Sequence, residues 1–212
     1  MNPKLPTLTA VLLLSLATPL LGANLLVNPG FEAPITFDGP PFVGSWEGFN
    51  GGGASAFNTT AQPRTGVQSL GLSITATPNT FAGAFQDVGG LTAGTLLSVD
   101  GWHASPSSPL SLVVEVRIEW RNSVSDTEIS RTLNANPIPS AAYTEFGFNA
   151  AVPAGADTAR LVYAIQSFST APLGNGTVYM DDISLTVVPE PASMTLLGLG
   201  GLALVTMRRR RA

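Results

Sequence analysis

Strict alternation of apolar and polar side chains over residues 112–121 limits what this chain can fold into more than any other feature of its sequence. The apolar series on one face consists of Leu112, Val114, Val116, Ile118 and Trp120. The opposite face consists of Val113, Glu115, Arg117, Glu119 and Arg121. A period of two maintained over this length is typical of a β-strand that turns one face to a core and the other to water.

Shorter alternating segments recur along the chain, at residues 70–74, 97–103, 145–152 and 161–165. Clusters of Gly, Pro, Asn, Ser and Thr separate them, and the chain between its two ends keeps no helical period beyond a turn or two. This pattern favours an all-β fold of two antiparallel sheets packed face to face, in which every strand buries one side. The stretches 50–55 and 104–109, rich in Gly or in Ser and Pro, are expected to be loops at the ends of this sandwich.

The last strand of the pattern changes phase at a pair of aspartates. Val178 and Met180 share one face, whereas the apolar series that starts at Ile183 continues on the register one residue later. A β-bulge supplies one such extra residue, and here it falls on Asp181-Asp182. Because two adjacent carboxylates are costly unless a cation neutralises them, this pair is a candidate site.

The N-terminus, residues 1–23, has the composition of a secretory signal helix. It carries one cation, Lys4, followed by an apolar run from Leu8 to Ala17 and small residues before Asn24. A positive start, a short apolar centre and a small residue at the exit are the three parts of a signal peptide. We expect cleavage after residue 23, which leaves a body that begins at Asn24.

The C-terminus is equally unlike a globular domain. Residues 192–207 are apolar and uncharged, and they are followed by Arg208, Arg209, Arg210 and Arg211. A helix of this length spans about 24 Å, somewhat less than the ~30 Å hydrocarbon core of a bilayer, so it is expected to cross a membrane as a single, marginal transmembrane helix. The arginines should stay on the cytoplasmic side and place the rest of the chain outside.

The body between these ends is strongly acidic and contains no cysteine. Residues 24–191 hold five arginines, no lysine and fourteen carboxylates, a net charge of −9. Nucleic-acid binding needs clustered cations, so we expect no nucleic-acid partner. The absence of cysteine from the whole sequence rules out disulfides and thiolate chemistry, so the domain must be held by its core, with or without a metal ion.

The C-terminal motif carries the first of two family resemblances. The stretch VPEPAS at residues 188–193, with the apolar run and the arginines after it, resembles the PEP-CTERM sorting signal of Gram-negative bacteria. The resemblance implies that residues 188–212 are a sorting signal and that an exosortase-type protease cuts at Pro189, Glu190 and Pro191. It implies an intermediate held in the inner membrane by residues 192–207, and a product at the cell surface or in the extracellular matrix.

The second resemblance covers residues 24–187. The stretches NLLVNPGFE at 24–32 and YMDDISL at 179–185 resemble the opening and closing motifs of family 4 and family 9 carbohydrate-binding modules. The resemblance implies a galactose-binding-like jelly-roll β-sandwich with a structural calcium ion that joins the first and last strands. Glu32 and either Asp181 or Asp182 are the implied ligands, since calcium prefers hard oxygen donors. The alternative is that these carboxylates are simply solvated at strand ends.

Sugar recognition needs an aromatic platform with hydrogen-bonding groups beside it. Trp102 alternates onto one face with Asp100 and Ser98, which makes it the best platform candidate, although packing under a loop explains it equally well. Trp46 is a second candidate that the sequence also allows as a core or rim residue. Trp120 alternates inward and is expected in the core.

The sequence offers little for catalysis, and we expect no enzyme activity. The only histidine, His103, alternates inward, and no nucleophile elbow, paired metal-binding histidines or phosphate-binding loop is present. Glu115 and Glu119 share a strand face with Arg117 between them, which favours a solvated charge ladder. Two hypotheses remain: a structural protein of the cell surface or biofilm matrix, and a carbohydrate-binding module that recognises an exopolysaccharide.

Overall fold

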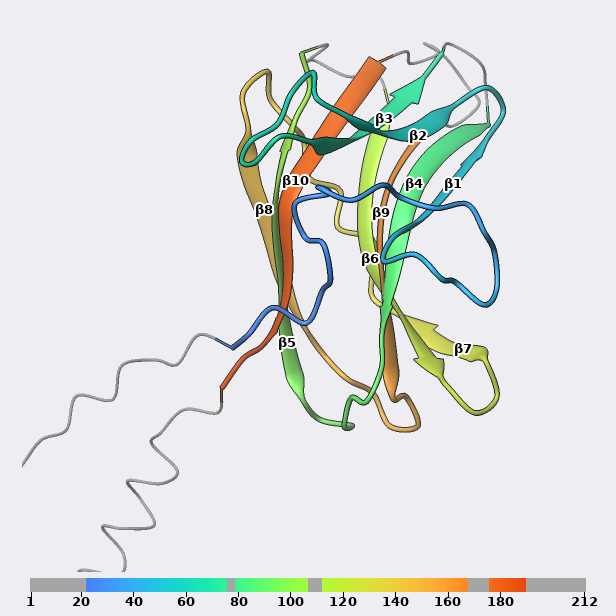
Figure 1. Cartoon of the computed structure of the whole chain (residues 1–212). Helices are drawn as coiled ribbons and strands as arrows, with labels where there is room; N and C mark the ends of the chain where they lie inside the picture. The colour runs from blue at the N-terminus through green and yellow to red at the C-terminus, as the bar shows by residue number, and fades with distance from the viewer. Residues whose placement is uncertain (1–21, 76–78, 107–111, 168–175, 190–212) are drawn as a thin grey trace, which may run out of the picture. The chain divides into compact units, whose positions relative to one another are not determined.

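Ten antiparallel β-strands, with no helix among them, form the part of the chain that the computed structural model describes, residues 22–75, 79–106, 112–167 and 176–189 (Figure 1). The strands are β1 (Glu47–Gly51), β2 (Ser55–Thr59), β3 (Ser69–Ile74), β4 (Thr80–Val88), β5 (Leu96–Ala104), β6 (Val113–Asn122), β7 (Thr127–Arg131), β8 (Thr144–Ala151), β9 (Thr158–Ser167) and β10 (Gly176–Val187). They belong to one compact unit, Gly22–Val188.

The strands form two five-stranded sheets. Sheet A has the order β1-β4-β9-β6-β7, and sheet B has the order β2-β3-β10-β5-β8. Every pairing between neighbouring strands is antiparallel, and the chain passes between the sheets repeatedly along its length. This is the jelly-roll β-sandwich that the sequence predicted, and the alternation of apolar side chains is its cause, because each strand buries one face between the sheets.

The core lies between the two sheets and follows the predicted faces. In β6 the inward series Val114, Val116, Ile118 and Trp120 is buried, as predicted. It is joined in the core by leucine, isoleucine and valine side chains from both sheets, among them Leu161 of β9 and Leu185 of β10. Burying one such side chain contributes about 1.5–3 kcal/mol, so this cluster is the main source of stability in a domain without disulfides.

The first described segment runs along the last strand. The amide of Leu25 donates to the carbonyl of Leu185, and the amide of Ile183 donates to the carbonyl of Pro29. The side chain of Asn24 bonds the backbone of both Ile183 and Leu185. The segment that follows the expected signal cleavage site is therefore fastened to β10.

The β-bulge predicted in the last strand is present. The register between β10 and β5 shifts between Asp181 and Ser184, so that the pairing of Asp181 with Trp102 is followed by that of Ser184 with Asp100. Asp182 adopts a left-handed conformation with φ of 48°, which aspartate tolerates better than most residues. The shift keeps Met180 and Ile183 buried in spite of the change of phase.

Several predictions fall on residues outside the described ranges. They are the signal helix up to residue 21, the transmembrane segment 192–207 and the motif and tail residues Glu190, Pro191, Arg208, Arg209, Arg210 and Arg211. Within the described ranges, no helix has the length and apolar character needed to span a membrane.

Candidate functional site

The carboxylates predicted to bind calcium converge on one loop, residues 64–68, between β2 and β3. Asp181 Oδ2 accepts hydrogen bonds from the backbone amides of Arg64 at 2.8 Å and Thr65 at 3.2 Å. Glu32 Oε1 accepts from the amides of Val67 at 2.8 Å and Gln68 at 3.2 Å. Glu32 of the opening motif and Asp181 of the closing motif therefore both bind this loop, and each does so by accepting hydrogen bonds from its backbone amides.

Asp182 contacts the same loop through its side chain. Its Oδ2 is 2.5 Å from Nη1 of Arg64, and its Oδ1 accepts from Thr65 Oγ1 at 2.6 Å. The guanidinium carbon of Arg64 lies 3.9 Å from the ring centroid of Trp102. Burial raises the pKa of the Asp181 carboxyl, and the hydrogen bonds from the amides of Arg64, Thr65 and Asp182 oppose this rise.

These side chains do not fit a calcium ion as they lie. Calcium takes six to eight oxygen ligands, whereas both oxygens of Asp181 and both of Asp182 already accept hydrogen bonds from N–H or O–H donors. In the described part of the chain, no group of three or more His, Cys, Asp or Glu side chains is placed to hold a metal. The calcium ion stays a prediction, and the direction of these carboxylates argues against it.

The two predicted sugar-binding tryptophans differ in position. Trp46 is completely buried, its indole Nε1 donates to the carbonyl of Asn28 at 3.0 Å, and its ring packs 4.9 Å from that of Phe31. A side chain with no exposed ring face cannot stack on a sugar, so Trp46 takes the core role that the sequence also allowed.

Trp102 and Asp100 share the outer face of sheet B, as predicted. Asp100 accepts from Ser98 Oγ at 2.9 Å, and a shallow hollow of about 550 Å³ between β5 and β8 is lined by Ser98, Asp100 and residues 145–149. Trp102 is half-buried, and Arg64 covers its ring. The tryptophan is therefore near polar groups, but Arg64 occupies a ring face that a sugar would need.

His103 is a core residue, as predicted. Its side chain is buried, and its Nδ1 lies 2.8 Å from the hydroxyl of Tyr163. Burial lowers the pKa of His103 to about 4, which keeps the imidazole neutral at physiological pH.

A phenylalanine cluster on the outer face of sheet A was missed by the sequence analysis. It consists of Phe42, Phe49, Phe81 and Phe85. Phe42 packs edge-on against Phe85 with ring centroids 5.0 Å apart, and Phe49 lies 6.2 Å from Phe81 and 6.3 Å from Phe85. Phe81 is 42% exposed and Phe42 is 37% exposed, so the cluster offers apolar ring surface to solvent.

Strand register explains why this cluster faces outward. On β4 the small residues Ala82 and Ala84 pair with Ile165 and Tyr163 of β9 and are buried in the core, which turns Phe81 and Phe85 to the other side. Large residues outside and small residues inside reverse the usual pattern, so alternation on β4 alone would have placed the phenylalanines inward.

A charged row lies on the same face of sheet A. Arg117 on β6 bonds both Glu115 and Glu119, and Gln166 of β9 donates to Glu115. The alternation of charges on this strand predicted a solvated ladder, and this prediction is wrong, because Glu115 is 4% exposed and Glu119 is 7% exposed. The reason is that β6 lies inside the sheet between β9 and β7, and Arg117 lies across both carboxylates.

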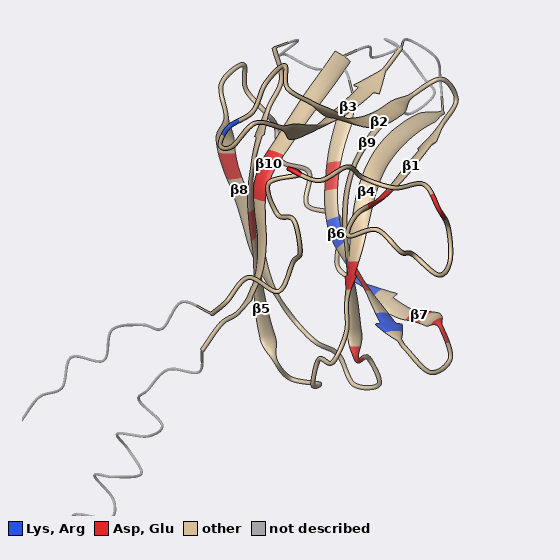
Figure 2. Ribbon diagram, in the orientation of Figure 1, with Lys and Arg blue, Asp and Glu red and all other residues tan. Residues whose placement is uncertain are grey.

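Most of the body's cations gather on this face. Of its five arginines, Arg117, Arg121, Arg131 and Arg160 lie on β6, β7 and β9 (Figure 2). Each pairs with a carboxylate, as in the bonds from Arg160 to Asp87 at 2.7 and 2.8 Å. The face is thus rich in charge but has no excess of positive charge.

The register places the phenylalanine cluster and the charged row side by side. One cross-strand row runs from Phe49 on β1 through Gly83 on β4 and Ala164 on β9 to Glu115 on β6. The ring of Phe49 lies where a side chain at residue 83 would stand, so this close approach requires glycine. Aromatic rings and hydrogen-bonding side chains therefore share one surface, separated by small residues.

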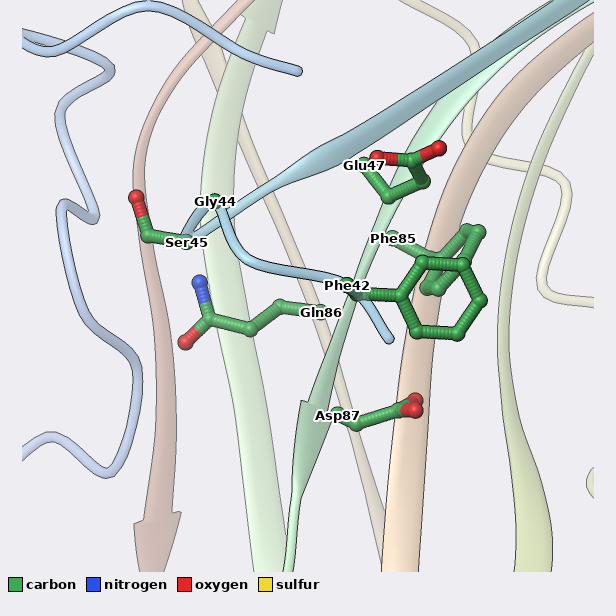
Figure 3. Close-up of a pocket in the computed structure, with 7 residues that line it drawn as sticks. All are labelled: Phe42, Gly44, Ser45, Glu47, Phe85, Gln86 and Asp87. Carbon is green, nitrogen blue, oxygen red and sulfur yellow. The ribbon is translucent and has the colours of Figure 1, made fainter. Parts of the chain in front are cut away.

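A small cavity of about 90 Å³ lies at one end of the phenylalanine cluster (Figure 3). In this view Glu47 and the rings of Phe42 and Phe85 line one side of it, and Ser45 and Gln86 line the other. Glu47 is buried and accepts hydrogen bonds from the amides at residues 38 and 39 and from the hydroxyl at residue 36. Glu47 thereby anchors the loop that brings Phe42 onto the face.

Comparison with known protein families identifies the C-terminal signal. Residues 187–211 match the PEP-CTERM protein-sorting motif, as predicted, and this motif marks an exported protein that is processed at a membrane. No curated protein matches the sequence.

Comparison with solved structures supports the predicted fold. The CBM22-1 xylan-binding domain from Paenibacillus barcinonensis superposes with a TM-score of 0.53 at 15% identity, covering 80% of this chain and 97% of that domain. A CBM4 structure gives 0.52 at 19% identity, covering 76% and 99%. The enzymatically active domain of bacteriophage CBA120 tailspike protein 4 gives 0.53 at 12% identity, covering 68% of this chain, which spans only 19% of the tailspike domain. At these identities the similarity establishes the fold.

Proposed function

We propose that this is a non-catalytic protein of the cell surface or extracellular matrix that binds a neutral polysaccharide through the outer face of sheet A. The observation that carries the proposal is the row from Phe49 to Glu115, which places the phenylalanine cluster, with Phe42 and Phe81 exposed, beside the hydrogen-bonded charged row of β6. Sugars have apolar ring faces and polar edges, so a surface of this kind matches them on both counts. The carbohydrate-binding modules with the same fold support the proposal.

Charge supports a neutral ligand rather than an acidic one. The body carries a net charge of −9, and the arginines on the face are already paired with Glu115, Glu119, Glu128, Asp126 and Asp87. An anionic polysaccharide would be repelled by the whole molecule and would have to break these pairs. A neutral polysaccharide is not repelled by the protein and leaves these ion pairs intact.

The side chains that resemble catalytic groups are committed to other contacts, which supports a non-catalytic role. His103 is buried against Tyr163. Glu115 and Glu119 are both bound by Arg117, and Glu115 also accepts a hydrogen bond from Gln166.

The end of the fold is compatible with processing at the sorting motif. β10 ends at Val187, the amide of Val188 donates to the carbonyl of Leu96 at 2.9 Å, and Pro189 is exposed. The Pro-Glu-Pro motif thus begins just after the last bond to the sheet. An exosortase-type protease, the partner that the motif implies, would cut there without removing any part of the sandwich.

Glycan binding is tested with an array of neutral and anionic polysaccharides and with affinity electrophoresis of variants. Phe81→Ala should weaken binding about tenfold or more, which corresponds to the loss of one stacking contact. Phe57→Ala is the matched control. Phe57 is 36% exposed and its ring lies over Gly71, and both residues belong to sheet B rather than to the proposed binding face. Equal loss in both variants, or preference for anionic chains, would contradict the proposed site.

A purely structural role is the second candidate. It is favoured by the packing of Phe42 against Phe85 and of Arg160 over the Phe85 ring at 4.1 Å, which stabilises this surface without any ligand. A wild-type protein that binds no glycan on the array but remains in the extracellular matrix after export would select this role.

A further inference from the structure

Arg64 is the only arginine of the body that lies away from sheet A. It belongs to the loop between β2 and β3, and it contacts two strands of sheet B. Its backbone amide donates to Asp181, its Nη1 pairs with Asp182 at 2.5 Å, and its guanidinium carbon lies 3.9 Å from the centre of the Trp102 ring. One residue thus touches the bulge of β10 and the neighbouring position on β5.

At both of these positions the sequence predicted a ligand that is not part of the chain. A cation was expected beside Asp181-Asp182, and a sugar ring was expected on Trp102. A guanidinium satisfies both requirements, because it is always charged, donates several N–H groups in one plane and stacks on aromatic faces. The carboxylate of Asp181, which Arg64 reaches only through its backbone, is satisfied by the amides of Arg64, Thr65 and Asp182.

We infer that Arg64 is a built-in cation that occupies both places. The contacts between the first segment, the 64–68 loop and the last strand then need no metal ion, and Arg64 takes a ring face of Trp102 on which a sugar would stack. The inference is independent of the glycan-binding proposal, because Trp102 lies on sheet B and the phenylalanine cluster lies on sheet A.

The stability that Arg64 contributes depends on how exposed its ion pair with Asp182 is. The side chain of Arg64 is 31% exposed and that of Asp182 is 26% exposed, so the ion pair is partly screened by water and the stacking on Trp102 adds to it. Replacing Arg64 by alanine should lower Tm by about 5 °C. Arg64→Lys keeps the charge and loses the planar stacking, so its Tm should lie between those of the wild type and the alanine variant.

The first experiment measures thermal unfolding of the full-length chain in mild detergent, followed by tryptophan fluorescence, in calcium chloride or in a chelator. The wild type should give the same Tm in both, and equilibrium dialysis against calcium should find none bound. A Tm that rises with calcium concentration, as expected for an ion that binds only the folded state, would overturn the inference.

The second experiment measures quenching of tryptophan fluorescence by acrylamide. Trp46 and Trp120 are buried, so Trp102 is the accessible tryptophan of the three. Arg64→Ala should increase quenching relative to the wild type. The matched control is Arg131→Ala, which removes an exposed arginine on β7 and should leave quenching unchanged and lower Tm less than Arg64→Ala does. An Arg64→Ala variant that behaves like Arg131→Ala would refute the role assigned to Arg64.

Discussion

Glu32, near the start of the body, and Asp181, in its last strand, accept hydrogen bonds from the same loop, each through one oxygen and two backbone amides. The loop at residues 64–68 lies between them and joins the two ends of the domain. This geometry gives both residues a structural role that does not depend on what the domain binds.

The first prediction compares how much Asp181 and Glu32, the two carboxylates that anchor the loop, each contribute to stability. Asp181→Asn should lower the free energy of unfolding by about 2–3 kcal/mol, because the buried carboxylate accepts three amide hydrogen bonds. Glu32→Gln should cost about 1 kcal/mol or less, since Glu32 is exposed. Urea unfolding measures both, with Glu145→Gln on the exposed side of β8 as control. A larger loss for Glu32→Gln than for Asp181→Asn would show that the anchors are ranked wrongly.

The second prediction concerns the charged row of β6. Arg117→Ala removes the cation that binds the buried carboxylates Glu115 and Glu119. Glu119 keeps Arg131 at 4.0 Å, whereas Glu115 loses its cation, so the change should cost about 3 kcal/mol or more. Arg131→Ala, which removes a half-exposed partner of Glu128, should cost less than about 1 kcal/mol. Chemical denaturation at neutral pH compares the two. Similar values for both variants would mean that the row is solvated after all.

The third prediction is a pH dependence from His103. Because burial lowers the pKa of His103 from 6.5 to about 4, the unfolded chain takes up a proton before the folded protein does as the pH falls. This residue's contribution to stability is therefore complete above about pH 6.5 and is lost between pH 6.5 and 4, by about 3 kcal/mol.

His103→Gln tests this dependence, because glutamine keeps a polar partner for Tyr163 and does not titrate. The variant should lose less stability than the wild type over the same pH interval, when unfolding is followed by urea titration at several pH values. Carboxylates titrate equally in both proteins, so the difference isolates the histidine. Parallel curves for the two proteins would contradict the assignment.

The fourth prediction concerns processing in a host that contains the sorting machinery. The intact mass of the exported protein should correspond to a chain that begins at Asn24 and ends within Pro189-Glu190-Pro191. Replacing Glu190 by alanine should leave the chain uncut and in the membrane fraction. Recovery from the cell surface of a protein that still carries Arg208 to Arg211 would contradict this account.

Local patterns along the chain were enough to predict the class of fold and the irregularity in its last strand. A period of two is a property of the strand backbone, so the inward face of β6 and the buried position of His103 follow from local spacing alone. The change of phase at Asp181-Asp182 likewise predicted the bulge, because one extra residue must be accommodated wherever the apolar register shifts. The sorting motif is also local, since its order of prolines, apolar run and arginines needs no fold to be recognised.

The neighbours of each strand, in contrast, could be identified only from the folded arrangement of the chain. Alternation shows that a strand has two faces, but the partners on each face come from strands remote in sequence, and their register sets what each side chain meets. For this reason Phe81 and Phe85 face outward over a core filled by alanines, and Glu119 is buried although its strand pattern predicts exposure. For the same reason Arg64, in the loop between β2 and β3, covers the ring of Trp102 on β5, a contact between a loop and a strand that no local pattern contains.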